Sequence, residues 1–331
     1  MSDQKQRLLT GLQSSGSLHI GNYFGALKPF VDMYEQYVSY LMVADYHALT
    51  SLRNQEEMHA NIISVVKDYL AVGVDPEKCV LFRQSDNQDH MELAWVFNCM
   101  VKVQFLELGH AYKDKVAKGL EPNAGLFTYP MLQAADITLY DIDVVPVGED
   151  QRQHLEYARE AVGKFNRAFA QDTSESGHTY TDDQIIPILK APAEKIIDTV
   201  GVVPGTDGGK MSKSKGNTIP LFGTDEEIEK AVMSIVTDSD GSKPEHVYAI
   251  HRLIKSAAEL DPIYEANQGR YGDLKKLLAA DLQALIAPMR ERRNAITDEH
   301  VMTILKTGAE TAKQTSHRTI NKVRSAIGIN L

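Results

Sequence analysis

The segment Tyr40-Leu41-Met42-Val43-Ala44-Asp45 is apolar without interruption up to its terminal acid. A strand buried on both faces has such a continuous run, whereas a strand with one solvated face alternates. Two other short apolar segments, residues 7–13 and 80–84, lie before and after it, with helical periodicity between each pair. This alternation predicts an α/β domain with a parallel sheet, whose ligands bind beyond the carboxyl ends of the strands.

Helical periodicity continues along the rest of the chain. Apolar residues recur at three- and four-residue spacing from Asn22 to Tyr34, and residues 57–72 form an amphipathic stretch. Residues 91–169 are mostly helical in pattern, interrupted by a strand-like run at residues 143–148. We therefore expect most of the first half of the chain to consist of helices that cover a sheet.

The Gly-rich segment Gly201–Gly216 separates this part from a helical last third. The first helix there is predicted by a capping box, Thr224 with Glu227 three residues later. Further helices are expected over residues 244–260, 272–296 and 298–327. We therefore expect a Rossmann-like catalytic domain over residues 1–218 and a helical domain over residues 219–331. The sequence leaves open whether the last helix packs back on the first domain.

Charge and hydropathy exclude several classes of protein. The net charge of −10 argues against a surface that coats nucleic acid, because such surfaces need excess Lys and Arg. A local contact stays open, since residues 306–331 carry one acid, Glu310, against five basic residues, Lys306, Lys313, Arg318, Lys322 and Arg324. No apolar run approaches the length of a membrane span, and the polar start lacks the apolar core of a signal peptide. We expect a cytoplasmic protein that does not bind membranes.

The chain has only two cysteines, Cys79 and Cys99, and no second pair to complete a zinc or iron–sulfur site. We expect both to be buried thiols and expect no structural metal.

The sequence does not match the common nucleotide-binding fingerprints. No Gly-x-Gly-x-x-Gly follows a predicted strand. The nearest candidate for a Walker loop, Gly205–Met211, has one residue too few between Gly205 and Gly209, and Met stands where Ser or Thr should hold magnesium. A nucleotide would have to be bound by other means.

Two separated segments offer such means. The first, Gln13-Ser14-Ser15-Gly16-Ser17-Leu18-His19-Ile20-Gly21-Asn22, leads from the first strand into the first helix, where backbone N–H groups favour phosphate. The second, Lys210-Met211-Ser212-Lys213-Ser214, carries two ammonium groups and two hydroxyls that can follow the phosphates as pyrophosphate forms. Taken alone, the first segment could be an ordinary capped helix, and the second could be a basic surface loop. Their combination, with a whole α/β domain between them, is more specific and resembles the class I aminoacyl-tRNA synthetases.

Within that class the sequence resembles the tryptophanyl-tRNA synthetases. The resemblance covers nearly the whole chain. It rests chiefly on residues 21–27, 45–50, 129–137, 145–151, 210–217 and 235–239.

The resemblance implies a role for particular residues. Asp136 would accept the indole N–H of tryptophan, and because a buried carboxylate is costly unless it is hydrogen-bonded, it is not expected to be idle. The other expected tryptophan-pocket residues are Tyr129, His47, Gln151, Gln133, Val147 and Leu9. ATP would be bound by Gln13, Ser14, Ser15, Gly21, Asn22, Gly148, Glu149, Asp150, Val203, Lys210, Met211, Ser212, Lys213 and Ser214. Catalysis would depend on His19, Asn22, Lys115, Lys210, Ser212 and Lys213.

The resemblance also implies substrates and partners. The substrates would be L-tryptophan, ATP with Mg²⁺ and tRNA(Trp), with no metal bound by the protein itself. The helical domain would read the anticodon, and the enzyme would be a homodimer.

One position separates tryptophan from tyrosine specificity. Gln133 stands where many tryptophan enzymes have Met, and tyrosine enzymes often combine Gln and Asp at this spacing. Archaeal-type tyrosine enzymes place a Tyr two residues before the Gly that ends the first strand, whereas this chain has Leu9 before Gly11. A phenol hydroxyl would lack that partner, so tyrosine is disfavoured.

Three alternatives remain. They are a tyrosyl-tRNA synthetase, a catalytically idle synthetase-like protein that binds tRNA or a partner, and a nucleotidyltransferase of the phosphopantetheine type. The last two leave Asp136 unexplained.

Overall fold

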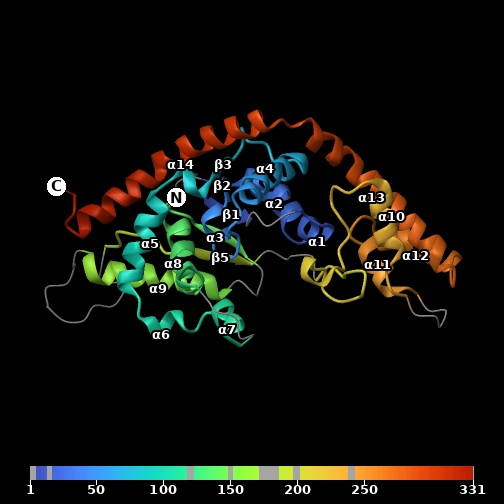
Figure 1. Cartoon of the computed structure of the whole chain (residues 1–331), viewed down its shortest axis with the longest axis horizontal. Helices are drawn as coiled ribbons and strands as arrows, with labels where there is room; N and C mark the ends of the chain where they lie inside the picture. Colours follow the sequence, from blue (N-terminus) through green and yellow to red (C-terminus); the bar gives the residue numbers. More distant parts are fainter. Residues whose placement is uncertain are drawn as a thin grey trace.

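The computed structural model describes residues 5–12, 17–117, 123–147, 152–170, 186–196, 202–237 and 243–330 (Figure 1). Within these ranges, the side chains of a few residues, including Lys115 and Val147, lie outside the description.

The described part of the chain contains one parallel sheet of five strands in the order β3-β2-β1-β4-β5. The strands are β1 (Arg7–Leu12), β2 (Val38–Val43), β3 (Val80–Arg83), β4 (Val144–Val147) and β5 (Ala193–Ile196). The chain builds outward from β1 on one side and then crosses to β4 on the other. This reversal is the topological switch point of a Rossmann-like fold, where ligands bind beyond the strand ends. The predicted α/β class is confirmed.

One strand was not predicted. The sequence Ala193-Glu194-Lys195-Ile196 of β5 carries two charges and lacks an apolar run. It is the last strand in the sheet and pairs only with β4. An edge strand need not be buried on both faces, so the pattern that indicates central strands does not detect it.

Helices connect and cover the strands of the first half. The first connection is a continuous helix whose middle turn is π-helical, made of α1 (Ile20–Asn22), Tyr23–Leu27 and α2 (Lys28–Met33). The others are α3 (Asp45–Ala48), α4 (Gln55–Ala71), α5 (Asp89–Met100), α6 (Val103–Leu106), α7 (His110–Ala117), α8 (Ala124–Thr138) and α9 (Arg152–Phe169).

Neighbouring residues of β1, β2 and β3 enter different cores, as expected for a sheet covered on both faces. Leu8, Leu41 and Leu81 pack in a cluster with residues of α2 and α4, and this cluster continues into the helical last third. Leu9, Tyr40, Met42 and Phe82 pack in a second cluster with residues of α5, α8 and α9.

The last third is helical (Figure 1). Its helices are α10 (Asp225–Met233), α11 (Glu245–His251), α12 (Ala257–Ala266), α13 (Tyr271–Ala295) and α14 (Asp298–Ala326). The predicted capping box is present: the Glu227 N–H donates to Thr224 Oγ1 at 3.2 Å and the Thr224 N–H to Glu227 Oε2 at 2.9 Å. The single helix expected over residues 244–260 is wrong. Ser256 caps a new helix there, because its Oγ accepts the Glu259 N–H at 3.3 Å.

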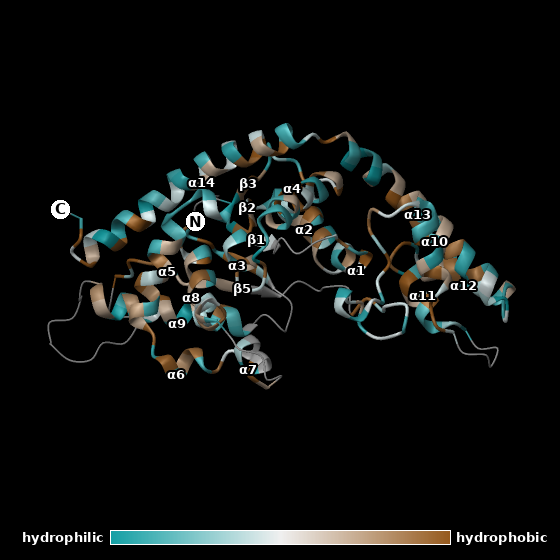
Figure 2. Ribbon diagram, viewed as in Figure 1, coloured by the Kyte–Doolittle hydropathy of each residue, from teal (hydrophilic) through white to brown (hydrophobic). Residues whose placement is uncertain are grey.

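Helix α14 runs back along the sheet domain, with a hydrophilic outer side (Figures 1 and 2). Its residues Ala309, Ala312, Ile320 and Val323 belong to the cluster that contains Phe82 and α5. A Cβ added to Gly308 would lie 1.8 Å from the carbonyl oxygen of Leu81, so only glycine permits this approach to β3. The last helix is therefore part of the same core as the sheet.

The expected burial of both thiols is wrong, because Cys99 is exposed on α5. Cys79 is partly buried, and burial raises the pKa of its thiol to about 12. Within the described ranges, no helix is both long and apolar enough to cross a bilayer.

Candidate active site

Several of the residues predicted from sequence come next in the chain after β1 and β4, the two strands that flank the switch point. Gln13, Ser14 and Ser15 follow β1 directly, and Gly148, Glu149, Asp150 and Gln151 follow β4. These seven residues lie outside the described part of the chain, as do the side chains of Lys115 on α7 and Val147 at the end of β4.

The segment around His19 is paired with the chain that follows Ser214. The N–H of Ile20 donates to the carbonyl of Ile219 at 3.0 Å, and the N–H of Leu221 donates to the carbonyl of Leu18 at 3.1 Å. Residues about 200 positions apart are thus joined by backbone hydrogen bonds. The fold brings the two predicted ATP segments together.

His19 is buried where the two segments meet. Burial and the charge of Lys213 lower the pKa of its imidazole to about 4, so the ring is neutral at pH 7. Its Nδ1 has no hydrogen-bond partner among the described residues. Its backbone N–H donates to Oδ1 of Asn22 at 3.1 Å, which fixes the turn into α1. A buried ring nitrogen without a partner is costly unless a ligand or water meets it.

Gly21 has a second reason to be glycine besides the approach of a nucleotide. A Cβ at this position would lie 2.9 Å from Nδ1 of His19 and 3.3 Å from Sδ of Met211. The missing side chain therefore lets the imidazole and the second segment pack closely.

The second segment is exposed but anchored at its base. Lys210, Lys213 and Ser214 are exposed, while Met211 is buried. Oγ of Ser212 and Oγ of Ser214 lie 3.0 Å apart. The two lysines and two hydroxyls thus stand on one short loop, next to His19.

Asn217 is the anchor, and sequence analysis gave it no role. It is buried, and its Oδ1 accepts the Ser212 N–H at 2.8 Å. Its Nδ2 donates to the carbonyl of Lys210 at 3.1 Å and to Oδ1 of Asp207 at 2.6 Å. The carbonyl of Val203, predicted to contact adenine, accepts the N–H of Met211 at 3.0 Å. Its position was the signal that the sequence offered for Asn217, because it is the last residue of segment 210–217, one of those on which the resemblance rests.

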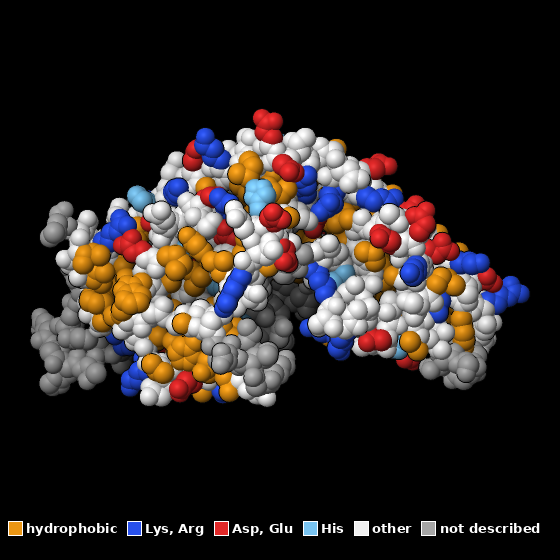
Figure 3. Space-filling model, viewed as in Figure 1, with side chains coloured by type: hydrophobic (Ala, Val, Ile, Leu, Met, Phe, Trp, Pro, Cys, Tyr) orange, Lys and Arg blue, Asp and Glu red, His pale blue; other side chains and the backbone are white. Residues whose placement is uncertain are grey.

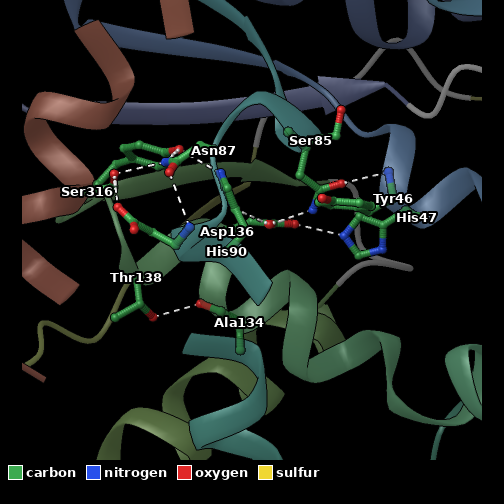
Figure 4. Close-up of polar contacts among 12 residues, drawn as sticks. Tyr46, His47, Ser85, Asn87, His90, Ala134, Asp136, Thr138 and Ser316 are labelled. Atoms are coloured by element: carbon green, nitrogen blue, oxygen red, sulfur yellow. Dashed lines mark hydrogen bonds and ion pairs between the residues drawn. The ribbon is translucent and has the colours of Figure 1, made fainter. Parts of the chain in front are cut away.

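Asp136 lies on α8 with only 2% of its surface exposed. Its Oδ1 accepts from Nε2 of Gln84 at 2.7 Å and from Nδ1 of His90 at 2.7 Å. Its Oδ2 lies 2.8 Å from Nε2 of His47 (Figure 4). Burial raises the pKa of this carboxyl, but hydrogen bonds from His47 and His90 outweigh it and lower the pKa to about 2. The carboxylate is ionised and held by three side chains.

Gln84 and His90 were missed in the sequence. Gln84 directly follows β3, at the edge where parallel strands present ligand-binding groups, so its position was a usable signal. His90 stands near the start of α5 among residues with no motif, and nothing in the sequence links it to Asp136.

The described pocket residues Tyr129, His47, Leu9 and Gln133 have contacts in or near the cluster on the α8 side of the sheet. Oη of Tyr129 lies 2.7 Å from Nε2 of His154, and its ring is 6.3 Å from that of His47. Leu9 is buried in the cluster that contains Ala134 and Ala135 of α8, and Gln133 of that helix is half-buried.

A cavity of about 360 Å³ lies beside this group. His47, Tyr129, Thr50, Met91 and Leu132 contribute to its walls. Because His47 also meets Asp136, it connects the cavity wall with the buried carboxylate. No cluster of three metal-binding side chains occurs among the residues that the structure describes.

Comparison with known proteins gives this arrangement a family. The family model for class I tRNA synthetases (W and Y) matches residues 1–301. The tryptophan–tRNA ligase of Fusobacterium nucleatum is 41% identical over 98% of this chain and 98% of its own. That of Rhodopirellula baltica is 39% identical over 98% of this chain and 99% of its own.

Solved structures agree. A crystal structure of tryptophanyl-tRNA synthetase from Campylobacter jejuni, complexed with ADP and tryptophan, is 38% identical with a TM-score of 0.87, and the match covers 98% of this chain and 100% of that one. A tyrosyl-tRNA synthetase from Archaeoglobus fulgidus, 22% identical with a TM-score of 0.61 over 87% of this chain and 90% of its own, shares the fold. The chain therefore belongs to the class I tRNA synthetases, and within them to the tryptophan–tRNA ligases.

Proposed function

We propose that this protein activates L-tryptophan with ATP and transfers it to tRNA(Trp). In the first step, the carboxylate of tryptophan attacks the α-phosphorus of ATP in line, and the bond to the leaving pyrophosphate breaks. Because an amino-acid carboxylate is already ionised at neutral pH, this step needs no general base. Catalysis then consists of positioning and charge stabilisation.

The phosphates of ATP would lie where the two paired segments meet. His19 is neutral and has an unpartnered Nδ1, so it can take part in a hydrogen bond with the nucleotide without adding charge. Lys210 and Lys213 would stabilise the charge on the departing pyrophosphate, together with Lys115 and the hydroxyls of Ser212 and Ser214. Mg²⁺ would enter with ATP as part of the substrate. Gln13 to Ser15, Gly21, Asn22, Gly148 to Asp150, Val203 and Met211 would complete the ATP site.

Asp136 would recognise the indole N–H. A carboxylate offers about two acceptor sites on each oxygen. Oδ1 already accepts two hydrogen bonds, whereas among the described residues Oδ2 meets only His47. Oδ2 therefore has room for one more donor, which suits the single N–H of indole. Tyr129, Gln133, Val147, Gln151 and Leu9 would form the remaining walls and hold the α-amino group.

In the second step, a ribose hydroxyl at the 3′ end of tRNA would take tryptophan from the adenylate. The helical last third, proposed here as residues 219–331, would contact the anticodon, where unstacked bases can be read by side chains. Its α14 carries Lys306, Lys313, Arg318, Lys322 and Arg324, local cations on a chain whose net charge is −10.

A homodimer is supported by an exposed apolar surface. Trp95 and Met91 of α5 are 71% and 47% exposed, and Leu49 and Val103 are also exposed. Figure 3 shows hydrophobic side chains gathered over α5 and α6. Exposed apolar patches of this kind mark association surfaces. Trp95→Glu should shift the protein from dimer to monomer in sedimentation velocity, and an unchanged dimer would exclude this surface.

Two observations carry the proposal. Backbone hydrogen bonds of Leu18 and Ile20 with Leu221 and Ile219 join the His19 segment to the chain that follows the Lys210–Ser214 loop, and Asp136 is a buried, ionised carboxylate. The direct test is exchange of labelled pyrophosphate into ATP in the presence of single amino acids. Of the amino acids tested, only tryptophan should support this exchange. Stimulation by tyrosine instead would refute the assigned substrate, and no exchange with any amino acid would refute the activity.

A further inference from the structure

A chain of buried side chains connects Asp136 with the last helix (Figure 4). Nε2 of His90 lies 2.7 Å from Oη of Tyr140, in the turn after α8. Nδ2 of Asn87 lies 3.1 Å from the same Oη and 2.9 Å from Oγ of Ser316 on α14. Oγ of Ser316 donates to Oδ2 of Asp89 at 2.6 Å. Tyr140, Asn87, His90 and Ser316 are all buried.

The directions of the hydrogen bonds in this group of side chains follow from its Asp89 end. The backbone N–H of Asp89 can only donate, and it meets Oδ1 of Asn87 at 3.3 Å. The amide of Asn87 is thereby oriented, so its Nδ2 donates to both Tyr140 and Ser316. The Ser316 hydroxyl, which accepts from Asn87, in turn donates to Oδ2 of Asp89.

The hydrogen bonds that lead from Tyr140 through His90 to Asp136 follow in the same way. Oη of Tyr140 already accepts from Asn87, so its single proton is available for Nε2 of His90. An imidazole that accepts at Nε2 has its proton at Nδ1, and Nδ1 of His90 faces Oδ1 of Asp136 at 2.7 Å. His90 therefore donates to Oδ1, and with Gln84 it fills that oxygen. With respect to the part of the chain that the structure describes, Oδ2 is the oxygen that keeps a free acceptor site.

We propose that Tyr140 is a positioning residue for tryptophan recognition, held in its role by Asn87 and by Ser316 of the last helix. Tyr140 supports the His90 tautomer that the ionised Asp136 requires, because its hydroxyl donates to Nε2, and His90 together with Gln84 leaves Oδ2 as the remaining acceptor site for the indole N–H. This inference rests on the proposed function and adds a determinant of its specificity. It also gives α14 a role in the tryptophan pocket, although Ser316 lies 180 positions from Asp136.

The test compares tryptophan with its analogue β-(benzothiophen-3-yl)alanine, in which sulfur replaces the indole N–H. Tyr140→Phe keeps the ring and removes the hydroxyl, so it should raise the KM for tryptophan about tenfold in pyrophosphate exchange, as expected for loss of an oriented hydrogen bond to a charged group. Its kcat and its KM for ATP should change less than about twofold, and its KM for the analogue should stay near that of the unaltered protein. Ser316→Ala should show the same pattern at roughly threefold, because Asn87 still meets Tyr140.

Tyr40 provides the matched control. Its hydroxyl also bonds α14, with Oη 3.1 Å from Oγ1 of Thr315, and its ring stacks on that of Tyr140 at 4.9 Å. It has no bond to His90 or Asn87 among the described contacts. Tyr40→Phe should therefore leave the ratio of the two KM values unchanged.

Three outcomes would overturn the inference: equal losses for tryptophan and the analogue, no loss in either test variant, or the same discrimination change in Tyr40→Phe. If Tyr140→Phe fails to fold, Ser316→Ala alone decides. Failure of the unaltered protein to exchange with tryptophan would refute the proposed function, whereas exchange without a change in discrimination refutes only the role of Tyr140.

Discussion

Asp136 and the Lys210–Ser214 loop differ in almost every physical respect. The carboxylate is 2% exposed and is held by three side chains from α3, α5 and the residues that follow β3. The loop presents its two lysines to solvent and is fastened mainly at its base by Asn217. Under the proposed function, the amino acid would be recognised by a group fixed in a core, whereas the phosphates would be met by a surface segment. The comparison teaches that the two substrates would be bound by regions of very different burial.

The largest effect is expected at the loop. Lys213→Ala should lower kcat for pyrophosphate exchange by about 10²–10³-fold, because charge stabilisation in the transition state is lost. The KM for tryptophan should change little. Lys215→Ala, in the same loop, is the matched control and should stay within about threefold of the unaltered protein. Equal losses in both variants would mean that only the overall charge of the loop matters.

At the carboxylate the opposite split is expected. Asp136→Ala should lower kcat/KM for tryptophan by about 10²-fold, because the indole N–H and the three donors around Asp136 all lose their acceptor. ATP binding, measured by calorimetry, should be nearly unchanged. Unaltered use of tryptophan would show that another group accepts the indole proton. A loss of ATP affinity as large as the loss for tryptophan would remove the distinction between the two regions.

Asn217 tests whether the anchor matters more to turnover than to folding. Asn217→Ala removes one acceptor and two donated hydrogen bonds at the base of the loop, and kcat should fall about tenfold. The free energy of unfolding should fall by about 1–3 kcal/mol in urea titration, because Asn217 is buried and the groups that it bonds lose their partner. If stability fell sharply with kcat unchanged, Asn217 would be a structural residue only.

The smallest effect concerns pH and stability at His19. Its pKa is about 4 in the folded protein, below the roughly 6.5 of an unfolded chain, so the unfolded chain binds a proton first as pH falls. Stability from this site is complete above about pH 6.5 and is lost progressively down to about pH 4. His19→Asn should therefore lose less stability between pH 7 and pH 5 than the unaltered protein, measured by urea midpoints. Parallel slopes would contradict the burial of a neutral imidazole.

How well the site could be predicted also differs between the two regions. The phosphate segments were visible because compact polar residues and glycines break apolar runs in a recognisable order. His19, Gly21 and Lys213 were predicted from sequence for this reason. Backbone hydrogen bonds join residues 18 and 20 to residues 221 and 219, so the first segment lies beside the chain that follows the second. Asn217 lies at the end of the second segment, but nothing about an asparagine side chain there indicated a role.

The amino-acid site was only half visible. Asp136 stood out as a charge among apolar neighbours, and Gln84 followed a predicted strand. His90, Tyr140 and Ser316 did not, because each lies in a helical or apolar stretch typical of ordinary packing.

The sequence by itself determined the α/β class, four of the five strands and the family, since buried runs, caps and phosphate-binding segments are local patterns. Only the tertiary structure decided which donors surround Asp136 and that α14 lies against β3. The physical reason is that a hydrogen bond between residues 46 or 229 positions apart depends on where two elements cross, as for His90 with Asp136 and Asn87 with Ser316. No local sequence pattern encodes that crossing. Gly308 permits it, but in the sequence it cannot be told apart from any other glycine in a long helix.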